Sequence, residues 1–442
     1  MKMVQKIVME KQSAAEIKAY QEELLRRQLA YLNEQSPYYR ALFSRHAIDI
    51  EAIRTIADLS SIPTTSKDDI QHHNEAFFCV ARTSIVDYCT TSGTLGRPVS
   101  FGLTESDLER LAYNEMRSFE TIGVQPGDLV QLMTTMDRRF MAGLAYFLGL
   151  RKMGAGVLRV GSGVPQMQWD SILQYKPRFL IAVPSFLLKM IEYAEQHGID
   201  YRNSGVESVL CIGESLRDQQ LNDSLLTARI REKWPIKLHS TYASTEMGAA
   251  FTECSFFQGG HVHEDLIITE ILDDNEDQVA DGESGELVIT TLGVEAVPLL
   301  RFKTGDIVRR YTEPCACGRH TYRIGPVEGR KQHMVKYKGT TLYPPAMHDL
   351  LVGFTEIEHH VIEILNNDIG TDEIVVYICS KSPSDELLLD IKDHFRAKLR
   401  VTPRVEWRAI DELQKIIFNP LSRKPITFID KRQHLSTDTR LA

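Results

Sequence analysis

The sequence has no apolar run of about 18 residues or more, so no membrane-spanning segment is expected. Its first residues, Met1–Lys6, lack the apolar core of a signal peptide. Basic residues are not in excess either, because the formal net charge of the 442 residues is −9. Such a charge is not typical of proteins that bind nucleic acid or anionic membranes in general. We therefore expect a cytoplasmic protein with neither kind of partner.

Cysteine is also scarce, with seven residues in the chain. Cys79, Cys211 and Cys379 each stand alone in an apolar run, as in proteins of reducing compartments, and the other cysteines leave room for a metal site. Apolar residues make up 43% and charged residues 25% of the chain, which is typical of a soluble globular protein. The length favours two or more domains.

One polar stretch, Thr90–Pro98, lies between two β-prone runs and contains four hydroxyl residues, two glycines and an arginine. Glycines expose backbone N–H groups, hydroxyls add donors and a cation neutralises charge, which is what an oligophosphate needs from a loop. The same residues are also ordinary turn formers. In isolation, the stretch is therefore either a phosphate-binding loop or a polar hairpin turn.

Short apolar strands alternate with helices from residue 129 to residue 239. This pattern indicates a parallel sheet covered by helices on both faces, with ligands at the carboxyl ends of the strands. A capping box at Ser13 begins an earlier helix, and another helix is predicted over 105–121. The predicted strands are 129–133, 156–160, 179–183, 208–212 and 236–239, and the helices between them are 140–153, 166–174, 185–197 and 216–233.

The chain becomes β-rich after Cys254, with strands predicted over 266–272, 285–290 and 297–302. Residues 303–306 are expected to form a turn after the last of these strands. The final section of about 110 residues mixes strands and helices. The predicted class is thus α/β. A large N-terminal domain (1–331) has parallel sheets flanked by helices plus a β-rich section, and a small mobile α+β domain (332–442) follows.

Several motifs, taken in order, resemble the acyl-adenylate-forming superfamily and especially its phenylacetate–CoA ligase branch. The motifs are Thr91–Pro98, Tyr242–Glu246, Lys303–Asp306, Gly329–Arg330, Lys336–Gly339 and Ser422–Pro425. The resemblance implies a two-step ligase. An acid of aryl or arylacetic type reacts with ATP to give acyl-AMP and pyrophosphate, and coenzyme A then displaces AMP. The alternatives are transfer to the phosphopantetheine thiol of a separate carrier protein, and a binding relative without turnover.

The resemblance also implies roles for individual residues. Adenylation brings two anions together, so neutralisation of charge is the main catalytic need. Glu246 would bind Mg²⁺, Asp306 would accept both ribose hydroxyls, and Arg330 would donate to ribose or phosphate. Lys424 would reach the α-phosphate and the substrate carboxylate as the catalytic lysine. The remaining nucleotide and coenzyme A residues are Thr91, Ser92, Gly93, Thr94, Gly96, Arg97, Gly213, Glu214, Tyr242, Ala243, Ser244, Thr245, Lys338 and Gly339.

A second group of residues suits a metal. Cys254, His261, Cys315 and Cys317 offer three thiolates and an imidazole, the ligands of a closed tetrahedral zinc site. The branch named above resembles the chain here too. The alternatives are unpaired cysteines, or His263 as the histidine ligand. We expect a structural zinc that pins the β-rich section and takes no part in the chemistry.

The chain departs from the family pattern at several positions. Leu95 stands where threonine is common, and we predict that the loop closes only when nucleotide arrives. Gln332 occupies the expected hinge between the domains, where aspartate or lysine is usual. The segment 134–140 is either a solvated loop or a specificity element in which Arg138 or Arg139 meets a polar or anionic substituent of the acid. The resemblance is compatible with a homodimer.

Overall fold

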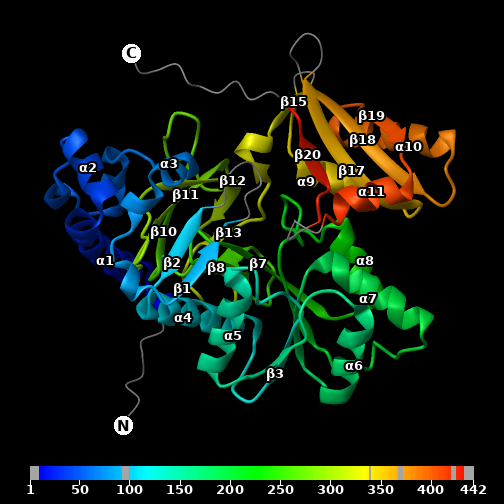
Figure 1. Ribbon diagram of the computed structural model, residues 1–442, viewed down its shortest axis with the longest axis horizontal. Helices are drawn as coiled ribbons and strands as arrows, with labels where there is room; N and C mark the ends of the chain where they lie inside the picture. Colours follow the sequence, from blue (N-terminus) through cyan, green and yellow to red (C-terminus); the bar gives the residue numbers. More distant parts are fainter. Residues whose placement is uncertain (1–8, 92–98, 338–339, 367–371, 420–424, 433–442) are drawn as a thin grey trace. The chain divides into compact units, whose positions relative to one another are not determined.

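The computed structural model describes residues 9–91, 99–337, 340–366, 372–419 and 425–432. The chain forms two compact units, Met1–Val327 and Glu328–Ala442 (Figure 1). In the described residues, no helix combines the length and apolarity needed to cross a membrane. The division of catalytic roles between the two domains predicted above stays a prediction.

The first unit begins with helices α1 (Ala14–Gln35), α2 (Pro37–Arg45) and α3 (Lys67–Phe77). The predicted capping box is confirmed at Ser13, whose hydroxyl accepts from the backbone N–H of Glu16 and whose backbone N–H donates to the Glu16 carboxylate. Ser36 ends α1 and caps α2, because its side chain accepts from Tyr39 N.

A single mixed sheet organises this unit, and its strand order is β10-β11-β12-β13-β9-β8-β7-β6-β5-β3-β4. Strand β7 (Lys237–Ser244) joins the two halves. It runs parallel to β6 over Lys237–Ser240 and then antiparallel to β8 over Thr241–Ser244. The predicted strand 236–239 was therefore too short, because pairing with β8 extends it through Ser244. The parallel half consists of β3 (Leu129–Leu132), β4 (Gly156–Arg159), β5 (Phe179–Ala182) and β6 (Ser208–Cys211).

Helices cover both faces of the parallel strands, as the sequence predicts (Figure 1). Side chains alternate along β5: Leu180 packs with the cluster of α6, α7 and α8, whereas Phe179 packs with that of α4 and α5. Burial on both faces explains the continuous apolar strands. The helices are α4 (Glu105–Ile122), α5 (Met141–Met153), α6 (Pro165–Tyr175), α7 (Pro184–Gln196) and α8 (Leu225–Lys233).

The predicted helix 216–233 was wrong in its first half, because α8 begins only after Ser224. The guanidinium of Arg217 is buried, and it forms ion pairs with Glu253 and Asp223. These pairs hold the segment before Ser224 in an irregular path. The hydroxyl of Ser224 then accepts from Thr227 N and caps the helix.

The antiparallel half of the sheet contains the β-rich section. Strands β1 (Asp87–Thr90) and β2 (Ser100–Leu103) form a separate antiparallel hairpin. In the sheet, the register of β11 and β12 shifts, because Val288 pairs with Lys303 but Glu286 pairs with Ile307. The prediction of a strand over 297–302 followed by a turn was wrong, since 303–306 lie inside β12. The strands are β8 (Ala249–Glu253), β9 (Gly260–His261), β10 (Ile267–Leu272), β11 (Ser284–Thr291), β12 (Phe302–Tyr311) and β13 (Arg323–Ile324).

The second unit is α+β, which confirms the predicted class. Its four-stranded sheet has the order β19-β18-β17-β20, with a core that α9 and α10 share. The sequence did not predict β16, α11 or β20. The elements are β14 (Gly329–Arg330), β15 (Val335–Tyr337), β16 (Thr340–Leu342), α9 (Pro344–Val352), β17 (Ile357–Asn366), β18 (Asp372–Ser380), α10 (Asp385–Leu399), β19 (Arg404–Trp407), α11 (Ile410–Ile417) and β20 (Phe428–Asp430).

Candidate functional site

Tyr242 and Asp306, two of the predicted nucleotide residues, meet although 64 positions separate them. The Tyr242 hydroxyl donates to Asp306 Oδ2 at 2.7 Å. Gly305 has a φ of 77°, and the extra residues of β12 at this point form a bulge. The backbone N–H of Asp306 also donates to Thr304 Oγ1 at 3.1 Å. The bulge thus directs a carboxylate that is only 6% exposed towards the end of β7.

Glu246 lies in the turn between β7 and β8, beyond Ala243, Ser244 and Thr245. The turn is closed by Ser244, whose carbonyl accepts from Gly248 N at 3.3 Å and whose hydroxyl accepts from Met247 N at 3.2 Å. The side chain of Glu246 is 15% exposed, so a carboxylate at this position is open to a ligand.

Lys67 is a cation beside Glu246 that the sequence analysis did not single out. Its Nζ lies 3.9 Å from Glu246 Oε1. The segment before it is held beside the Asp306 motif, because Thr65 N donates to Arg301 O and Lys303 N donates to Thr65 O. A signal was present in the sequence: a lysine directly after the N-cap Ser66 faces the positive end of the α3 dipole. A lysine at this position does not stabilise the helix through its dipole.

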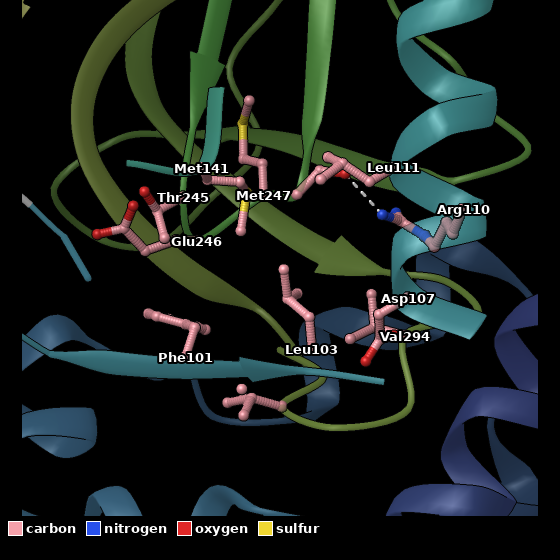
Figure 2. A pocket seen from close by; sticks show the side chains of 13 residues that line it. Phe101, Leu103, Asp107, Arg110, Leu111, Met141, Thr245, Glu246, Met247 and Val294 are labelled. Atoms are coloured by element: carbon pink, nitrogen blue, oxygen red, sulfur yellow. Dashed lines mark hydrogen bonds between the residues drawn. The ribbon is translucent and has the colours of Figure 1, made fainter. Parts of the chain in front are cut away.

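A pocket lies between the β1–β2 hairpin, α4 and the β7–β8 turn (Figure 2). Thr245 and Glu246 lie on one side of it and Arg110 on the other. Most of the wall is apolar, and the polar groups sit at its ends. The lining residues are Phe101, Gly102, Leu103, Asp107, Arg110, Leu111, Met141, Thr245, Glu246, Met247, Gly248, Val294 and Val297.

Gly213 and Glu214 follow β6, as predicted. Gly213 has a φ of 78°, and no atom lies within 4 Å of the place where a Cβ would stand, so its backbone borders open space. The Glu214 carboxylate accepts from Ser185 N at 2.8 Å and from Ser185 Oγ at 2.7 Å. Glu214 therefore binds the first turn of α7, and its predicted contact with nucleotide stays a prediction.

Thr91, the first residue of the connection between β1 and β2, is buried. Thr91 N donates to Val99 O at 3.1 Å, and Val99 N donates to Thr91 Oγ1 at 3.3 Å. These bonds close the base of the predicted phosphate loop. Arg330 belongs to the second unit. Ser92, Gly93, Thr94, Leu95, Gly96, Arg97, Lys338, Gly339 and Lys424 lie outside the described residues, so their roles, and the predicted closure of the loop, stay predictions.

The four predicted metal ligands come together. Their ligand atoms all lie within 4.8 Å of one another. Cys254 follows β8, His261 lies on β9, and Cys315 and Cys317 precede β13. Burial raises the pKa of Cys254 to about 12. At Cys317 burial has the same direction, but hydrogen bonds from His261 and Arg319 prevail and lower the pKa to about 5.

The two candidate histidines have different surroundings. His261 Nε2 lies 3.4 Å from Cys317 Sγ, while its Nδ1 lies 3.2 Å from Thr321 Oγ1. An outer partner of this kind fixes the orientation of a ligating imidazole. His263 instead contacts Glu10, with 2.6 Å between Nδ1 and Oε1. The structure thus favours His261 over the alternative ligand His263.

Comparison with known proteins adds to this geometry. The sequence profile of the family described as AMP-binding enzyme matches residues 24–295, more than half of the chain. The chain belongs to the family of AMP-binding enzymes. A phenylacetate-coenzyme A ligase of Thermus thermophilus is 30% identical over 362 residues, which cover 81% of this chain and 80% of that one. The phenylacetate-coenzyme A ligase of Escherichia coli (strain K12) is 28% identical, with 84% of each chain covered. The predicted resemblance to this branch is confirmed.

Solved structures of coenzyme A ligases share the fold. A 2-hydroxyisobutyryl-CoA ligase in complex with 2-HIB-AMP has a TM-score of 0.82 and 23% identity, and the match covers 96% of this chain and 91% of that one. A benzoate CoA ligase from Burkholderia xenovorans LB400 has a TM-score of 0.59 and 17% identity, with 79% and 68% covered. At these identities the likeness concerns the fold. It confirms the predicted architecture of a large α/β unit with a smaller α+β unit.

Proposed function

We propose that this AMP-binding enzyme is an acid–coenzyme A ligase. A carboxylate oxygen attacks the α-phosphorus of ATP, the α–β phosphoanhydride bond breaks, and pyrophosphate leaves. The thiolate of coenzyme A then attacks the acyl carbon, and AMP leaves with the acyl C–O bonding pair. The observation that carries the proposal is the Tyr242–Asp306 hydrogen bond, which gathers two residues of separate motifs near the Glu246 turn. The names of the curated relatives support coenzyme A as the acceptor.

The residues present fit a nucleotide and a hard cation. Asp306 offers a carboxylate, and its two oxygens together have enough lone pairs to accept the two vicinal hydroxyls that a ribose presents. Glu246 offers the oxygen ligand that Mg²⁺ prefers, and a bound Mg²⁺ would neutralise phosphate oxygens. Lys67 stands beside Glu246 as a further positive charge. Lys424 would reach the α-phosphate, and Arg330 would donate to ribose or phosphate. The 91–97 loop would hold the β- and γ-phosphates that leave as pyrophosphate, and Lys338 and Gly339 would serve the thiol step.

We further propose an aryl or arylacetic acid as the substrate, on the strength of the phenylacetate relatives. Arg138 and Arg139 would set the preference among such acids. Both are exposed, with φ of 57° and 56°, a backbone conformation that favours glycine. Arg139 O accepts from Thr90 N at 3.2 Å, so this segment contacts the base of the predicted phosphate loop. An acid with a polar or anionic ring substituent would suit these side chains.

The Cys254–His261–Cys315–Cys317 cluster would hold a structural Zn²⁺. Three sulfur atoms and one imidazole nitrogen match a closed tetrahedral site. All four positions are used by protein atoms, so no position is left for substrate. The metal would therefore join the end of β8, β9 and the loop before β13, and take no part in acyl transfer.

The test is release of pyrophosphate. The protein is incubated with ATP, Mg²⁺ and a panel of aryl, arylacetic and short acyl acids, with and without coenzyme A. We expect pyrophosphate with at least one acid and a thioester once coenzyme A is present. Asp306→Asn should lower kcat/KM for ATP by about 10- to 100-fold, because an amide accepts less strongly than a carboxylate. An unchanged acid preference in Arg139→Ala would exclude that residue from specificity.

The other outcomes separate the alternatives. Pyrophosphate without a coenzyme A thioester would favour a carrier protein as the acceptor, and a phosphopantetheinylated carrier protein would then be supplied in the same assay. No pyrophosphate across the whole panel, with normal binding of ATP, would favour a relative without turnover and contradict the proposal.

A further inference from the structure

Helix α4 presents two polar side chains to the backbone that follows Glu246. Arg110 Nη1 donates to Gly248 O at 2.7 Å. One helical turn later, Asn114 Oδ1 accepts from Ala250 N at 2.9 Å. Residues four apart lie on the same face of a helix. The α4 helix therefore fixes the backbone at the point where the β7–β8 turn becomes β8.

Arg110 joins this turn to two other segments. Its Nε donates to Leu292 O at 2.8 Å, and its Nη2 donates to Leu266 O at 2.6 Å. All three partners are backbone carbonyls, so the fork of the guanidinium holds three separate stretches of chain in one geometry. Burial lowers the pKa of Arg110 to about 10, which the charges of Asp107 and Asp265 oppose. The side chain stays charged at neutral pH.

Packing holds the turn on one side, where Met247 is fully buried in the core of the unit. The pocket described above borders Thr245, Glu246, Met247 and Gly248, so one side of the turn faces a cavity (Figure 2). The hydrogen bond from Arg110 to the turn runs along the edge of that cavity. A segment without close-packed neighbours on one side depends on its hydrogen bonds for its position.

The same helix is covalently continuous with the hairpin of the predicted phosphate loop. Strand β2 ends at Leu103, and Thr104 directly caps α4, with its hydroxyl accepting from Asp107 N at 3.1 Å. From this cap, Arg110 lies within the first two turns of the helix. A short rigid element therefore connects the hairpin with the turn that carries Glu246.

We propose that Arg110 is a positioning residue that holds Glu246 at a fixed place relative to the β1–β2 hairpin. This inference rests on the proposed function, because it assigns Glu246 to Mg²⁺ and the hairpin to the phosphates of the same nucleotide. Arg110 acts through the backbone of Gly248. Without the Arg110 side chain the turn relaxes into the neighbouring cavity, and the Glu246 carboxylate would no longer be held where it could bind Mg²⁺.

The experiment compares Arg110→Met, Arg110→Lys and a matched control, Arg323→Met. Arg323 is buried and, like Arg110, donates to backbone carbonyls, those of Gln258 and Glu313, which lie outside the turn. Binding of ATP with Mg²⁺ is measured by calorimetry over a range of Mg²⁺ concentrations. Amide hydrogen exchange of residues 245–250 is measured without nucleotide.

We expect Arg110→Met to exchange these amides at least tenfold faster and to bind Mg²⁺–ATP about tenfold more weakly, with a higher Mg²⁺ requirement. Arg110→Lys should recover part of both, because one ammonium can still reach a carbonyl. Arg323→Met should be destabilised to a similar degree without either change. If Arg110→Met does not fold, the lysine variant decides by the same readouts.

The outcomes distinguish the two hypotheses. Wild-type protein that does not bind Mg²⁺–ATP contradicts the proposed function and, with it, the role of Arg110 in metal placement. Wild-type protein that binds, together with Arg110 variants of unchanged Mg²⁺ requirement and unchanged exchange at 245–250, overturns the inference alone. Equal effects in the Arg323 variant would reduce Arg110 to a general stabilising residue and overturn it as well.

Discussion

At the scale of single residues, the Tyr242–Asp306 contact can be tested without altering the shape of the site. Tyr242→Phe keeps the ring and removes the donor to a carboxylate that is almost fully buried. We expect the free energy of unfolding to fall by about 1–2 kcal/mol, since a charged acceptor loses a partner. Affinity for ATP should fall several-fold, because Asp306 is no longer oriented. Thermal unfolding and calorimetry measure the two effects.

Tyr322→Phe is the control for this prediction. The Tyr322 hydroxyl lies 2.8 Å from Thr269 Oγ1, a partner other than Asp306. Its loss should lower stability by a similar amount and leave the affinity for ATP unchanged. Equal losses of affinity in both variants would show that the hydroxyl of Tyr242 contributes only to stability.

Glu115 on α4 is a second residue with a measurable consequence. Its side chain is 3% exposed, and Oε2 has no hydrogen-bond partner among the described residues. Burial raises the pKa of Glu115 to about 8 from a usual value of 4.5. The folded state therefore holds a proton on Glu115 that the unfolded chain releases. The contribution of this proton to stability is fully present below pH 4.5 and is lost as the pH rises towards 8.

Glu115→Gln should remove this pH dependence. An amide has a similar shape and no charge, so we expect the variant to be more stable than the wild type by about 2–4 kcal/mol at about pH 8 and nearly equal at about pH 4. Denaturant unfolding at several pH values measures the difference. Glu109→Gln, at an exposed position of the same helix, should leave the slope unchanged. If the free energy of unfolding changes with pH in the same way for the wild type and Glu115→Gln, the prediction is contradicted.

At the scale of elements, the bulge in β12 accounts for the orientation of Asp306. Gly305 has a φ of 77° and open space around its missing Cβ, so alanine there adds no clash and only backbone strain. We expect Gly305→Ala to cost about 1–2 kcal/mol of stability and to weaken binding of ATP, because the bulge rearranges. Gly282→Ala is matched, with a φ of 82° and the same open surroundings. It should lose stability only; a normal affinity in Gly305→Ala would contradict the role given to the bulge.

The elements that the sequence predicted well are those whose signal is local. The capping box at Ser13 is a motif of neighbouring residues, and the apolar strands of the parallel sheet are short runs of apolar residues. The failures are long-range. The extension of β7 depends on pairing with β8, and the delayed start of α8 depends on the ion pair between Arg217 and Glu253. No window of neighbouring residues contains such partners.

The candidate site shows the same division. The order of the motifs indicated Tyr242, Glu246 and Asp306, and the structure places the first and third in hydrogen-bond contact. The order of the motifs could not indicate that Asp306 lies inside a strand. The strand continues through Asp306 because of a bulge, and the bulge depends on how β12 pairs with β11. Lys67 was missed for a related reason: its approach to Glu246 depends on the pairing of Thr65 beside β12.

At the scale of the whole molecule, the segment beside the Cys254–His261–Cys315–Cys317 cluster contacts the start of the described chain. The Glu10 carboxylate, near the start of the described chain, accepts from Arg319 Nε at 2.7 Å, and Glu10 O accepts from His320 N at 2.9 Å. Burial would raise the pKa of Glu10, but the hydrogen bond to His263 and the two neighbouring arginines hold it well below its usual range. The loop that carries Cys315 and Cys317 thus also holds the N-terminal segment.

Removal of a metal from this cluster should therefore loosen both segments together. We expect about one zinc per chain by elemental analysis, and in Cys317→Ser we expect a midpoint of thermal unfolding lower by about 5 °C or more, with faster amide exchange at residues 9–12. A chelator that removes zinc from cysteine ligands should reproduce both changes in the wild type. Cys379→Ser, in the second unit, should retain the metal and the slow exchange at 9–12. Protein that contains no metal and yet keeps residues 9–12 protected would contradict the prediction, since the hydrogen bonds that Glu10 accepts would then suffice to hold the loop.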